Sequence, residues 1–274
     1  SSGTVRFADA FTFPVRWTLR KFGREIRRVP NEMTSGNPGV DWASFGSDLS
    51  DAETDLLERL SLSDLTPKAP ARFISQVDAC RHLSTHGIAG DFVELGVYKG
   101  AFSILAAAMF ELLDDKRQVF MFDTFSGMSE PKHDEVDSDG VRAVDRWREL
   151  GHGTQWWAAS KDEVFANFSL MHVSTKSVRA VIGDVRQTLK MPSTLPGQIA
   201  LLRLDLSTYE PTLFALRALW ERVPDGGVII WNSAPKMGAK WAIQDFFEGR
   251  EDSPLFVFVD EHTRIGVKVS SRMT

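Results

Sequence analysis

The feature that most constrains this chain is the alternation of apolar runs and amphipathic helical patterns that begins at Gly90. The apolar runs are continuous, which is typical of parallel strands covered by helices on both faces. The pattern therefore predicts a doubly wound α/β domain with a mostly parallel sheet. The predicted strands are Asp91–Leu95, Gln118–Asp123, Ser177–Ile182, Ile199–Asp205, Gly227–Asn232, Leu255–Val259 and Arg264–Val269.

The last two predicted strands are joined by only a short connection, Asp260–Thr263, which favours an antiparallel hairpin. A seven-stranded, mostly parallel sheet that ends in such a hairpin resembles the Rossmann-like layout of the class I methyltransferases. Dinucleotide dehydrogenases usually continue in parallel.

The chain before the first strand carries three helical patterns, at 11–29, 51–62 and 70–86. We predict a helical N-terminal extension at 1–89, which serves docking, oligomerisation or substrate cover, and a cofactor-binding domain at 90–274. The first pattern has one apolar stripe and an otherwise basic surface, so docking on the protein itself or on a second subunit is favoured. Contact with an anionic membrane is the alternative.

A long segment at about 126–159 interrupts the alternation and contains Trp147, Trp156 and Trp157. Long insertions at the carboxyl ends of strands are often lids or binding loops, and a solvated loop is the alternative. Because tryptophan is costly to leave in water, we predict a substrate lid.

Composition narrows the partners of the chain. Of its 274 residues, 43% are hydrophobic and 25% are charged, and no apolar run approaches the roughly 20 residues that span a bilayer. The net charge of −5 disfavours a nucleic-acid partner. A single cysteine, Cys80, excludes an internal disulfide and fits a reducing compartment. We therefore expect a cytoplasmic protein that acts on a small molecule; the homo-oligomer that we also expect follows from the N-terminal helical pattern and not from composition.

The first predicted strand and turn read FVELGVYKGAF, which places Glu94, Gly96 and Gly100 before a helix beginning at Ala101. Glycines let the backbone approach a ligand, and a helix N-terminus offers free N–H groups. The spacing differs from that of dinucleotide-binding and phosphate-binding loops. An acid here would repel a pyrophosphate but suits the ammonium group of S-adenosylmethionine, so we predict that these residues bind that cofactor.

Two further acids follow the second and third predicted strands. Asp123, followed by Thr124, can accept hydrogen bonds from both hydroxyls of a ribose. Asp184 follows Gly183 where an adenine amino group could be held, although it could instead cap a short helix at 185–189. Together with Glu94, these residues predict a site for a positively charged nucleoside.

The fourth predicted strand reads ALLRLDL and delivers Asp205 to the same edge of the sheet. Methyl transfer to a hydroxyl needs a positioned oxygen that loses its proton to a base or is acidified by a metal. We predict that Asp205 serves in one of these ways; capping of a helix at 209–223 is the alternative.

These residues together resemble the TylF-type (macrocin) sugar O-methyltransferases of natural-product pathways, from about Gly90 to Val267. The resemblance implies use of S-adenosylmethionine, often Mg²⁺, methylation of a sugar hydroxyl, and an oligomer. It implies cofactor roles for Glu94, Gly96, Gly100, Asp123 and Asp184, and a metal-ligand role for Asp205. The motifs that carry it are GDFVELGVYKG, FDTFSG, AASKDEVFANF, LRLDLSTYEPT, PDGGVII and KMGAKWAIQDFF.

The chain departs from this family in the catalytic half. The family has Asp-x-Asp after its fourth strand, and here Asp205 is followed two residues later by Ser207; the family's fifth strand ends in Asp-Asp-Tyr, and here it ends in Trp231-Asn232-Ser233. Mg²⁺ prefers carboxylate oxygens, so Asp205 with the amide of Asn232 should bind it weakly unless substrate oxygens complete the site. Metal-free catalysis is therefore the main expectation.

Without a metal, the base could be a histidine, and His262 in the hairpin connection is the first candidate, with His152 and His133 behind it. The main interpretation is an S-adenosylmethionine-dependent O-methyltransferase that acts on a glycosylated or hydroxylated acceptor, with Asp205, Asn232 and His262 in the catalytic region. The alternatives are a binding protein that has lost catalysis and a nicotinamide oxidoreductase.

Overall fold

The computed structural model describes residues 40–44, 48–66, 69–131, 136, 140–149, 157–233 and 238–269. The chain divides into two compact units, Ser1–Pro38 and Gly39–Thr274, and all of the described residues belong to the second. The amphipathic helix predicted at 11–29 lies outside the described residues, as do His133, His152 and Trp156.

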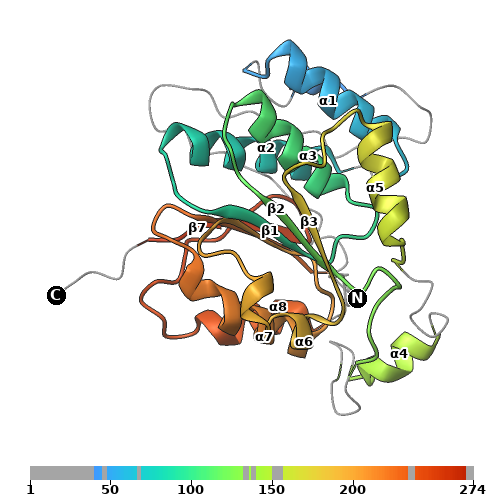
Figure 1. The fold of residues 1–274 in the computed structure, drawn as a ribbon. Coiled ribbons are helices and arrows are strands. Elements are labelled where there is room, and N and C mark those ends of the chain that lie inside the picture. The colour runs from blue at the N-terminus through green and yellow to red at the C-terminus, as the bar shows by residue number, and fades with distance from the viewer. Residues whose placement is uncertain are drawn as a thin grey trace, which may run out of the picture. The chain divides into compact units, whose positions relative to one another are not determined.

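A seven-stranded sheet with the order β3-β2-β1-β4-β5-β7-β6 forms the centre of the second unit (Figure 1). The first five strands are parallel, and β7 is antiparallel to both of its neighbours. This confirms the predicted fold class. The strands are β1 (Asp91–Leu95), β2 (Val119–Asp123), β3 (Val178–Ile182), β4 (Ile199–Leu204), β5 (Val228–Asn232), β6 (Val257–Phe258) and β7 (Thr263–Val267).

Helices cover both faces of the sheet, with α1, α2, α3 and α5 on one side and α6, α7 and α8 on the other (Figure 1). Side chains alternate between the two layers: Phe92 of β1 joins the first core, whereas Val93 and Leu95 join the second. The helices are α1 (Asp51–Leu62), α2 (Pro70–Thr85), α3 (Ala101–Leu112), α4 (Ala143–Glu149), α5 (Lys161–Leu170), α6 (Val185–Thr188), α7 (Tyr209–Leu219) and α8 (Ala239–Phe247), with 3₁₀ turns η1 (Trp42–Ser44), η2 (Pro192–Thr194) and η3 (Trp220–Arg222).

Helices α1 and α2 pack on α3 and share its core. Phe73 of α2 lies 5.3 Å from Phe102 of α3 between ring centroids, and Leu57 of α1 is fully buried in the same cluster. Burying one such side chain contributes about 1.5–3 kcal/mol. Ser50 begins α1 with a capping box, because its side chain accepts from the N–H of Glu53 while Glu53 accepts from the backbone of Ser50.

The order of the strands fixes where a ligand can enter. The chain leaves β1 towards β2 and leaves β4 towards β5, so the loops after β1 and β4 diverge at the carboxyl edge of the sheet and leave a crevice there. Gly96, with a φ of +85°, lies at this point, and a Cβ on it would collide with the backbone carbonyl of Asp205. Glycine therefore allows the two loops to lie against each other.

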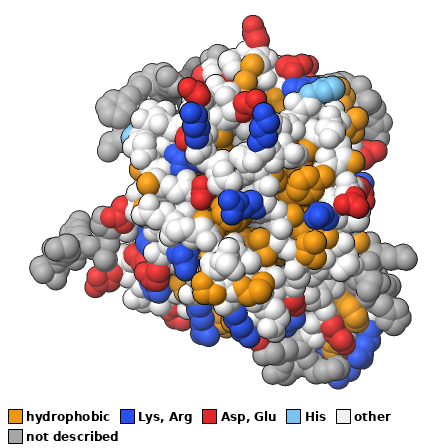
Figure 2. Space-filling model, in the orientation of Figure 1, with side chains coloured by type: hydrophobic (Ala, Val, Ile, Leu, Met, Phe, Trp, Pro, Cys, Tyr) orange, Lys and Arg blue, Asp and Glu red, His pale blue; other side chains and the backbone are white. Residues whose placement is uncertain are grey.

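The surface view shows Lys and Arg side chains interspersed with Asp and Glu side chains over the face drawn in Figure 2. Among the described residues, none of the helices has both the length and the apolar character needed to cross a bilayer.

Candidate active site

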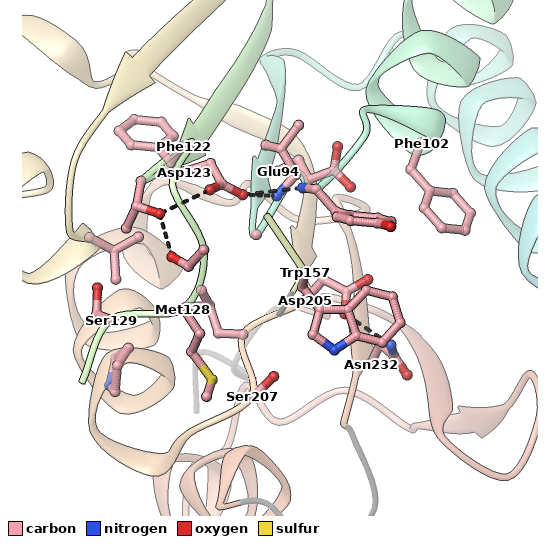
Figure 3. Close-up of a pocket in the computed structure, with 18 of the residues that line it drawn as sticks. Glu94, Phe102, Phe122, Asp123, Met128, Ser129, Trp157, Asp205, Ser207 and Asn232 are labelled. Atoms are coloured by element: carbon pink, nitrogen blue, oxygen red, sulfur yellow. Dashed lines mark hydrogen bonds between the residues drawn. The ribbon is translucent and has the colours of Figure 1, made fainter. Parts of the chain in front are cut away.

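A cavity opens at the carboxyl edge of the sheet, between the loops that follow β1, β2, β3 and β4 (Figure 3). It brings together eight of the ten residues predicted for the site, although these are spread over 139 positions of the sequence. They are Glu94, Gly96, Asp123, Thr124, Gly183, Asp184, Asp205 and Asn232.

The other two predicted residues, Gly100 and His262, are not among the residues that line the cavity. Gly100 is the N-cap of α3 with a φ of +88°, and a Cβ on it would lie 2.8 Å from the Val164 side chain of α5. Its geometry allows α3 and α5 to pack. The imidazole Nε2 of His262 lies 3.3 Å from Glu261 Oε1 in the turn before β7. The structure therefore does not bring His262 to the cavity wall.

Asp123, at the end of β2, organises the loop that follows β1. One carboxylate oxygen accepts from the backbone N–H groups of Val97 at 2.6 Å and Tyr98 at 3.2 Å (Figure 3). The other accepts from Phe125 N–H at 2.8 Å and lies 3.4 Å from Thr124 Oγ1. Because the single hydroxyl proton of Thr124 has a closer acceptor in the Gly127 carbonyl at 2.5 Å, this second oxygen keeps one acceptor site for a ligand.

Asp184 is the N-cap of α6, which the sequence offered as the alternative to ligand binding. Its Oδ1 accepts from Arg186 N–H at 2.8 Å, and its Oδ2 lies 2.5 Å from Arg186 Nη2. Burial would raise the pKa of Asp184, but the hydrogen bonds from Arg186 outweigh it and hold the pKa below its usual range. Asp184 thus stays charged while it also faces the cavity.

A buried ion cluster lies beneath the cavity floor. Glu94 is 1% exposed and accepts from Ser103 Oγ at 2.5 Å, and its Oε1 lies 3.4 Å from Arg203 Nε. Burial raises the pKa of Glu94 to about 8, although Arg203 and Ser103 act in the opposite direction. Arg203 stacks on Phe102, 3.4 Å from the ring centroid.

Arg203 also faces Asp205, the central predicted residue. Arg203 Nη2 lies 3.6 Å from Asp205 Oδ2, and Asn232 Nδ2 donates to Asp205 Oδ1 at 2.9 Å. Asn232 Oδ1 in turn accepts from Thr263 Oγ1 at 3.4 Å. The N-cap of α7 is Thr208, so the alternative role of Asp205 as the cap of this helix is wrong. A guanidinium and an amide therefore orient a carboxylate whose side chain remains 30% exposed.

The residues at this position do not fit a Mg²⁺ ion. Asp205 Oδ2 already faces a cation, and the amide nitrogen of Asn232 points at Asp205 Oδ1, where a ligand oxygen would be needed. Within the part of the chain that the structure describes, no three His, Cys, Asp or Glu side chains form a group that could hold a metal.

Sequence reasoning missed three contributors to the site. Arg203 had a usable signal, because a charged residue inside the apolar run ALLRLDL must find a buried partner. Arg72, from the first turn of α2, lines the cavity without any motif that marks it. Tyr98 also lines it and meets Trp157, one of the tryptophans predicted for the lid, edge to face at 5.1 Å between ring centroids.

Two named relatives support the interpretation of this site. The chain is 34% identical over 161 residues to 8-demethyl-8-(2,3-dimethoxy-alpha-L-rhamnosyl)-tetracenomycin-C 4'-O-methyltransferase of Streptomyces olivaceus, over 58% of this chain and 59% of that protein. It is 32% identical over 146 residues to demethyldecarbamoylnovobiocin O-methyltransferase of Streptomyces niveus, over 53% of each chain. The chain thus spans little more than half the length of these relatives.

Solved structures share the fold. The O-methyltransferase NovP superposes with a TM-score of 0.67 at 24% identity, over 76% of this chain and 84% of its own. The calicheamicin methyltransferase CalS11 superposes with a TM-score of 0.53 at 22% identity, over 85% of this chain and 99% of its own. The family described as macrocin-O-methyltransferase (TylF) matches residues 68–261, which include every cavity residue named above. The chain therefore belongs to the TylF macrocin-O-methyltransferase family, as the motifs of its sequence predicted.

Proposed function

We propose that this protein is an S-adenosylmethionine-dependent O-methyltransferase that acts on a hydroxyl of a sugar or another polar natural-product acceptor. The observation that carries the proposal is the set of carboxylates at the ends of β2, β4 and β3, namely Asp123, Asp205 and Asp184, which line one cavity in a member of this family. The names of the two relatives, which refer to a rhamnosyl tetracenomycin and a novobiocin precursor, support the choice of acceptor class.

The cavity residues fit the nucleoside part of S-adenosylmethionine. Asp123 keeps an acceptor site on Oδ1 for a ribose hydroxyl, and Asp184 offers acceptor oxygens for an amino group at the next strand end. Phe122, Met128 and Val185 give the same half of the cavity apolar surface suited to an adenine ring. Gly96, Thr124 and Gly183 complete this half of the proposed cofactor site, and Glu94 lies at its floor.

When bound, S-adenosylmethionine supplies a methyl group on a positively charged sulfur, which an acceptor oxygen displaces to leave S-adenosylhomocysteine. The protein must take the proton of the acceptor hydroxyl, and Asp205 is the group placed to accept it on Oδ1 or Oδ2. Asn232 and Arg203 hold this carboxylate in one orientation from two sides. Positioning of this kind contributes by removing the need to orient the base during the reaction.

We further propose that methyl transfer here does not use Mg²⁺. Support comes from the donor set, in which Arg203 supplies the positive charge beside Asp205 and Asn232 supplies an N–H donor. Asp205 therefore takes the place that the sequence offered to His262, and the metal role of Asp205 and Asn232 is set aside.

The cytoplasm and a homo-oligomeric state remain part of the proposal. The single cysteine, Cys80, is buried and free, which is compatible with a reducing compartment. The apolar stripe at 11–29 supports association with a second subunit.

Calorimetric titration with S-adenosylmethionine and with NAD⁺ tests the proposal. We expect binding of S-adenosylmethionine only, and a loss of about 10–100-fold in affinity in Asp123→Asn, which removes charge-assisted hydrogen bonds. Asp162→Asn is the matched control, because Asp162 lies in α5 outside the cavity wall. Binding of NAD⁺ in place of S-adenosylmethionine would overturn the assignment, and cofactor binding without turnover of any hydroxylated acceptor would favour a non-catalytic protein.

A further inference from the structure

We infer that Arg72 is an acceptor-binding residue, whose guanidinium donates hydrogen bonds to oxygens of a neutral, polyhydroxylated sugar ring. The inference rests on the proposed function and adds to it a residue and the neutral charge of the acceptor. No motif marks Arg72. It reaches the site from α2, which precedes the strands that carry the strand-end acids.

Arg72 is held in place by an ion pair with the turn between β6 and β7. Its Nε donates to Asp260 Oδ2 at 2.6 Å, and the two side chains are only 15% and 23% exposed. The other oxygen of Asp260 accepts from the backbone N–H groups of His262 at 2.9 Å and Thr263 at 2.8 Å. Because both oxygens of Asp260 are used, the direction of the Arg72 guanidinium is fixed before any ligand binds.

This arrangement leaves most of the donors of Arg72 open. A guanidinium carries five N–H groups, and the ion pair uses the one on Nε. Within the part of the chain that the structure describes, Nη1 and Nη2 make no hydrogen bond, although the side chain is largely buried and lines the cavity. Two neighbouring oxygens of an acceptor bound in this cavity could therefore accept from these N–H groups.

The position of Arg72 sets it apart from the nucleoside half of the proposed cofactor site. Asp260 and Thr263 stand beside Asn232, which contacts Asp205, so the turn that anchors Arg72 adjoins the proposed base. The proposed nucleoside half of the cavity is built from different loops, those after β2 and β3.

Charge and shape indicate a neutral acceptor. Asp260 cancels the charge of Arg72, and the carboxylates of Asp123 and Asp205 line the same cavity, so an anionic acceptor would be repelled. Leu65 and Pro211 give the wall apolar surface, against which the C–H face of a sugar ring can pack.

The test uses the full-length protein with p-nitrophenyl α-L-rhamnoside, its monodeoxy analogues, and p-nitrophenyl β-D-glucuronide as an anionic comparison. The variants are Arg72→Lys, which keeps the positive charge but loses the planar guanidinium with its two terminal nitrogens, and Arg72→Gln. Arg81→Gln is the matched control, because Arg81 lies on the same helix and pairs with Glu53 at 2.6 Å outside the cavity wall. Formation of S-adenosylhomocysteine is measured, together with the melting temperature of each variant.

We expect both Arg72 variants to raise the KM for the rhamnoside about tenfold, the effect of losing one or two hydrogen bonds, with kcat and the KM for S-adenosylmethionine within about twofold of the wild type. On the deoxy analogue that lacks the contacted oxygen, the wild type and Arg72→Gln should have the same KM. Arg81→Gln should leave every kinetic constant unchanged.

An unchanged KM for the rhamnoside in Arg72→Gln would overturn the inference and leave the proposed function standing. Equal losses towards acceptor and cofactor, matched by Arg81→Gln, would show a structural role and also overturn it. Preference for the glucuronide would overturn the neutral class of acceptor. A wild type that binds S-adenosylmethionine but methylates none of the glycosides would overturn the sugar class of acceptor, and with it the role of Arg72, while the proposed methyl transfer to another polar acceptor would still stand.

Discussion

The Asn232→Asp substitution tests how the end of β5 is built. Asn232 Nδ2 donates to Asp205 Oδ1 at 2.9 Å, and Arg203 Nη2 lies 3.6 Å from Asp205 Oδ2. A carboxylate at position 232 turns the hydrogen bond into a contact between like charges, of which Arg203 can neutralise only one. The variant also places a carboxylate where the resemblance drawn from the sequence implies one.

The size of the effect follows from this geometry. Two charges about 4 Å apart repel by about 4 kcal/mol at an effective dielectric constant of about 20. The pair can also avoid the repulsion by binding a proton. At pH 7 this costs about 1.4 kcal/mol for each of the roughly three pH units above the ordinary pKa near 4, so the destabilisation cannot exceed about 4 kcal/mol. Because Arg203 offsets part of the repulsion, we expect the free energy of unfolding to fall by about 2–3 kcal/mol and the melting temperature by roughly 5–10 °C.

The loss should depend on pH in a defined direction. Repulsion raises the pKa of the new pair in the folded protein, so the folded state binds more protons than the unfolded state above about pH 4. The destabilisation of Asn232→Asp is therefore largest at alkaline pH, declines as the pH falls through the raised pKa, and is absent near the unfolded pKa of about 4.

Differential scanning calorimetry with and without millimolar Mg²⁺ measures both effects. Asn232→Leu is the control, because it loses the same hydrogen bond without adding a charge. We expect Mg²⁺ to restore the melting temperature of Asn232→Asp and to leave the wild type and Asn232→Leu unchanged. A melting temperature of Asn232→Asp equal to that of Asn232→Leu at alkaline pH, or a wild type stabilised by Mg²⁺, would refute the reasoning.

Two further substitutions test the frame around the site. Gly96→Ala should lower the free energy of unfolding in urea by more than 2 kcal/mol, because the new Cβ collides with the Asp205 carbonyl at a φ of +85°. Gly87→Ala, at a φ of +61° with open space around it, should lower it by about 1 kcal/mol. Equal losses would contradict the close approach of the two loops. Asp252→Asn should lower the free energy of unfolding by about 2 kcal/mol at neutral pH, because the hydrogen bond from Arg250 holds the pKa of Asp252 below its usual range. This contribution to stability is present above the unfolded pKa near 4 and disappears as the pH falls through the folded pKa. A difference from the wild type that persists in acid would contradict that assignment.

Strands and helices whose sequence pattern agrees with their burial were predictable nearly to the residue. The predicted bounds of β1, Asp91–Leu95, and of α1, Asp51–Leu62, are those of the structure. The terminal hairpin was less so: residues 255–259 predicted a strand, but only Val257–Phe258 pair with β7. At the edge of a sheet, an apolar run can remain exposed, as Phe258 is at 62%, so its pattern says little about pairing.

The strand-end acids were predictable because topology places them. Parallel neighbouring strands carry their final residues to one edge, so Asp123, Asp184 and Asp205 had to lie near one another. The partners of these acids depend on packing between distant segments. Arg72 reaches Asp260 across 188 positions of the sequence, and no local pattern encodes such a contact.

The orientation of His262 likewise depends on its surroundings in the folded chain. Its position in the hairpin connection was predicted, but the turn directs its backbone N–H to Asp260 and its imidazole towards Glu261. The turn therefore keeps His262 out of the cavity wall, and we propose as the base Asp205, which lines the cavity and lies against Asn232 and Arg203.

The most direct test of the account is the rate of S-adenosylhomocysteine formation by the wild type and by Asp205→Asn, each with and without EDTA, on p-nitrophenyl α-L-rhamnoside. The account predicts that the wild-type rate is unchanged by EDTA. It also predicts that Asp205→Asn lowers kcat by about 10²–10⁴-fold, the usual contribution of a general base, while its affinity for S-adenosylmethionine stays within about twofold. Loss of the wild-type activity in EDTA that Mg²⁺ restores, or full activity in Asp205→Asn, would contradict metal-free catalysis through Asp205.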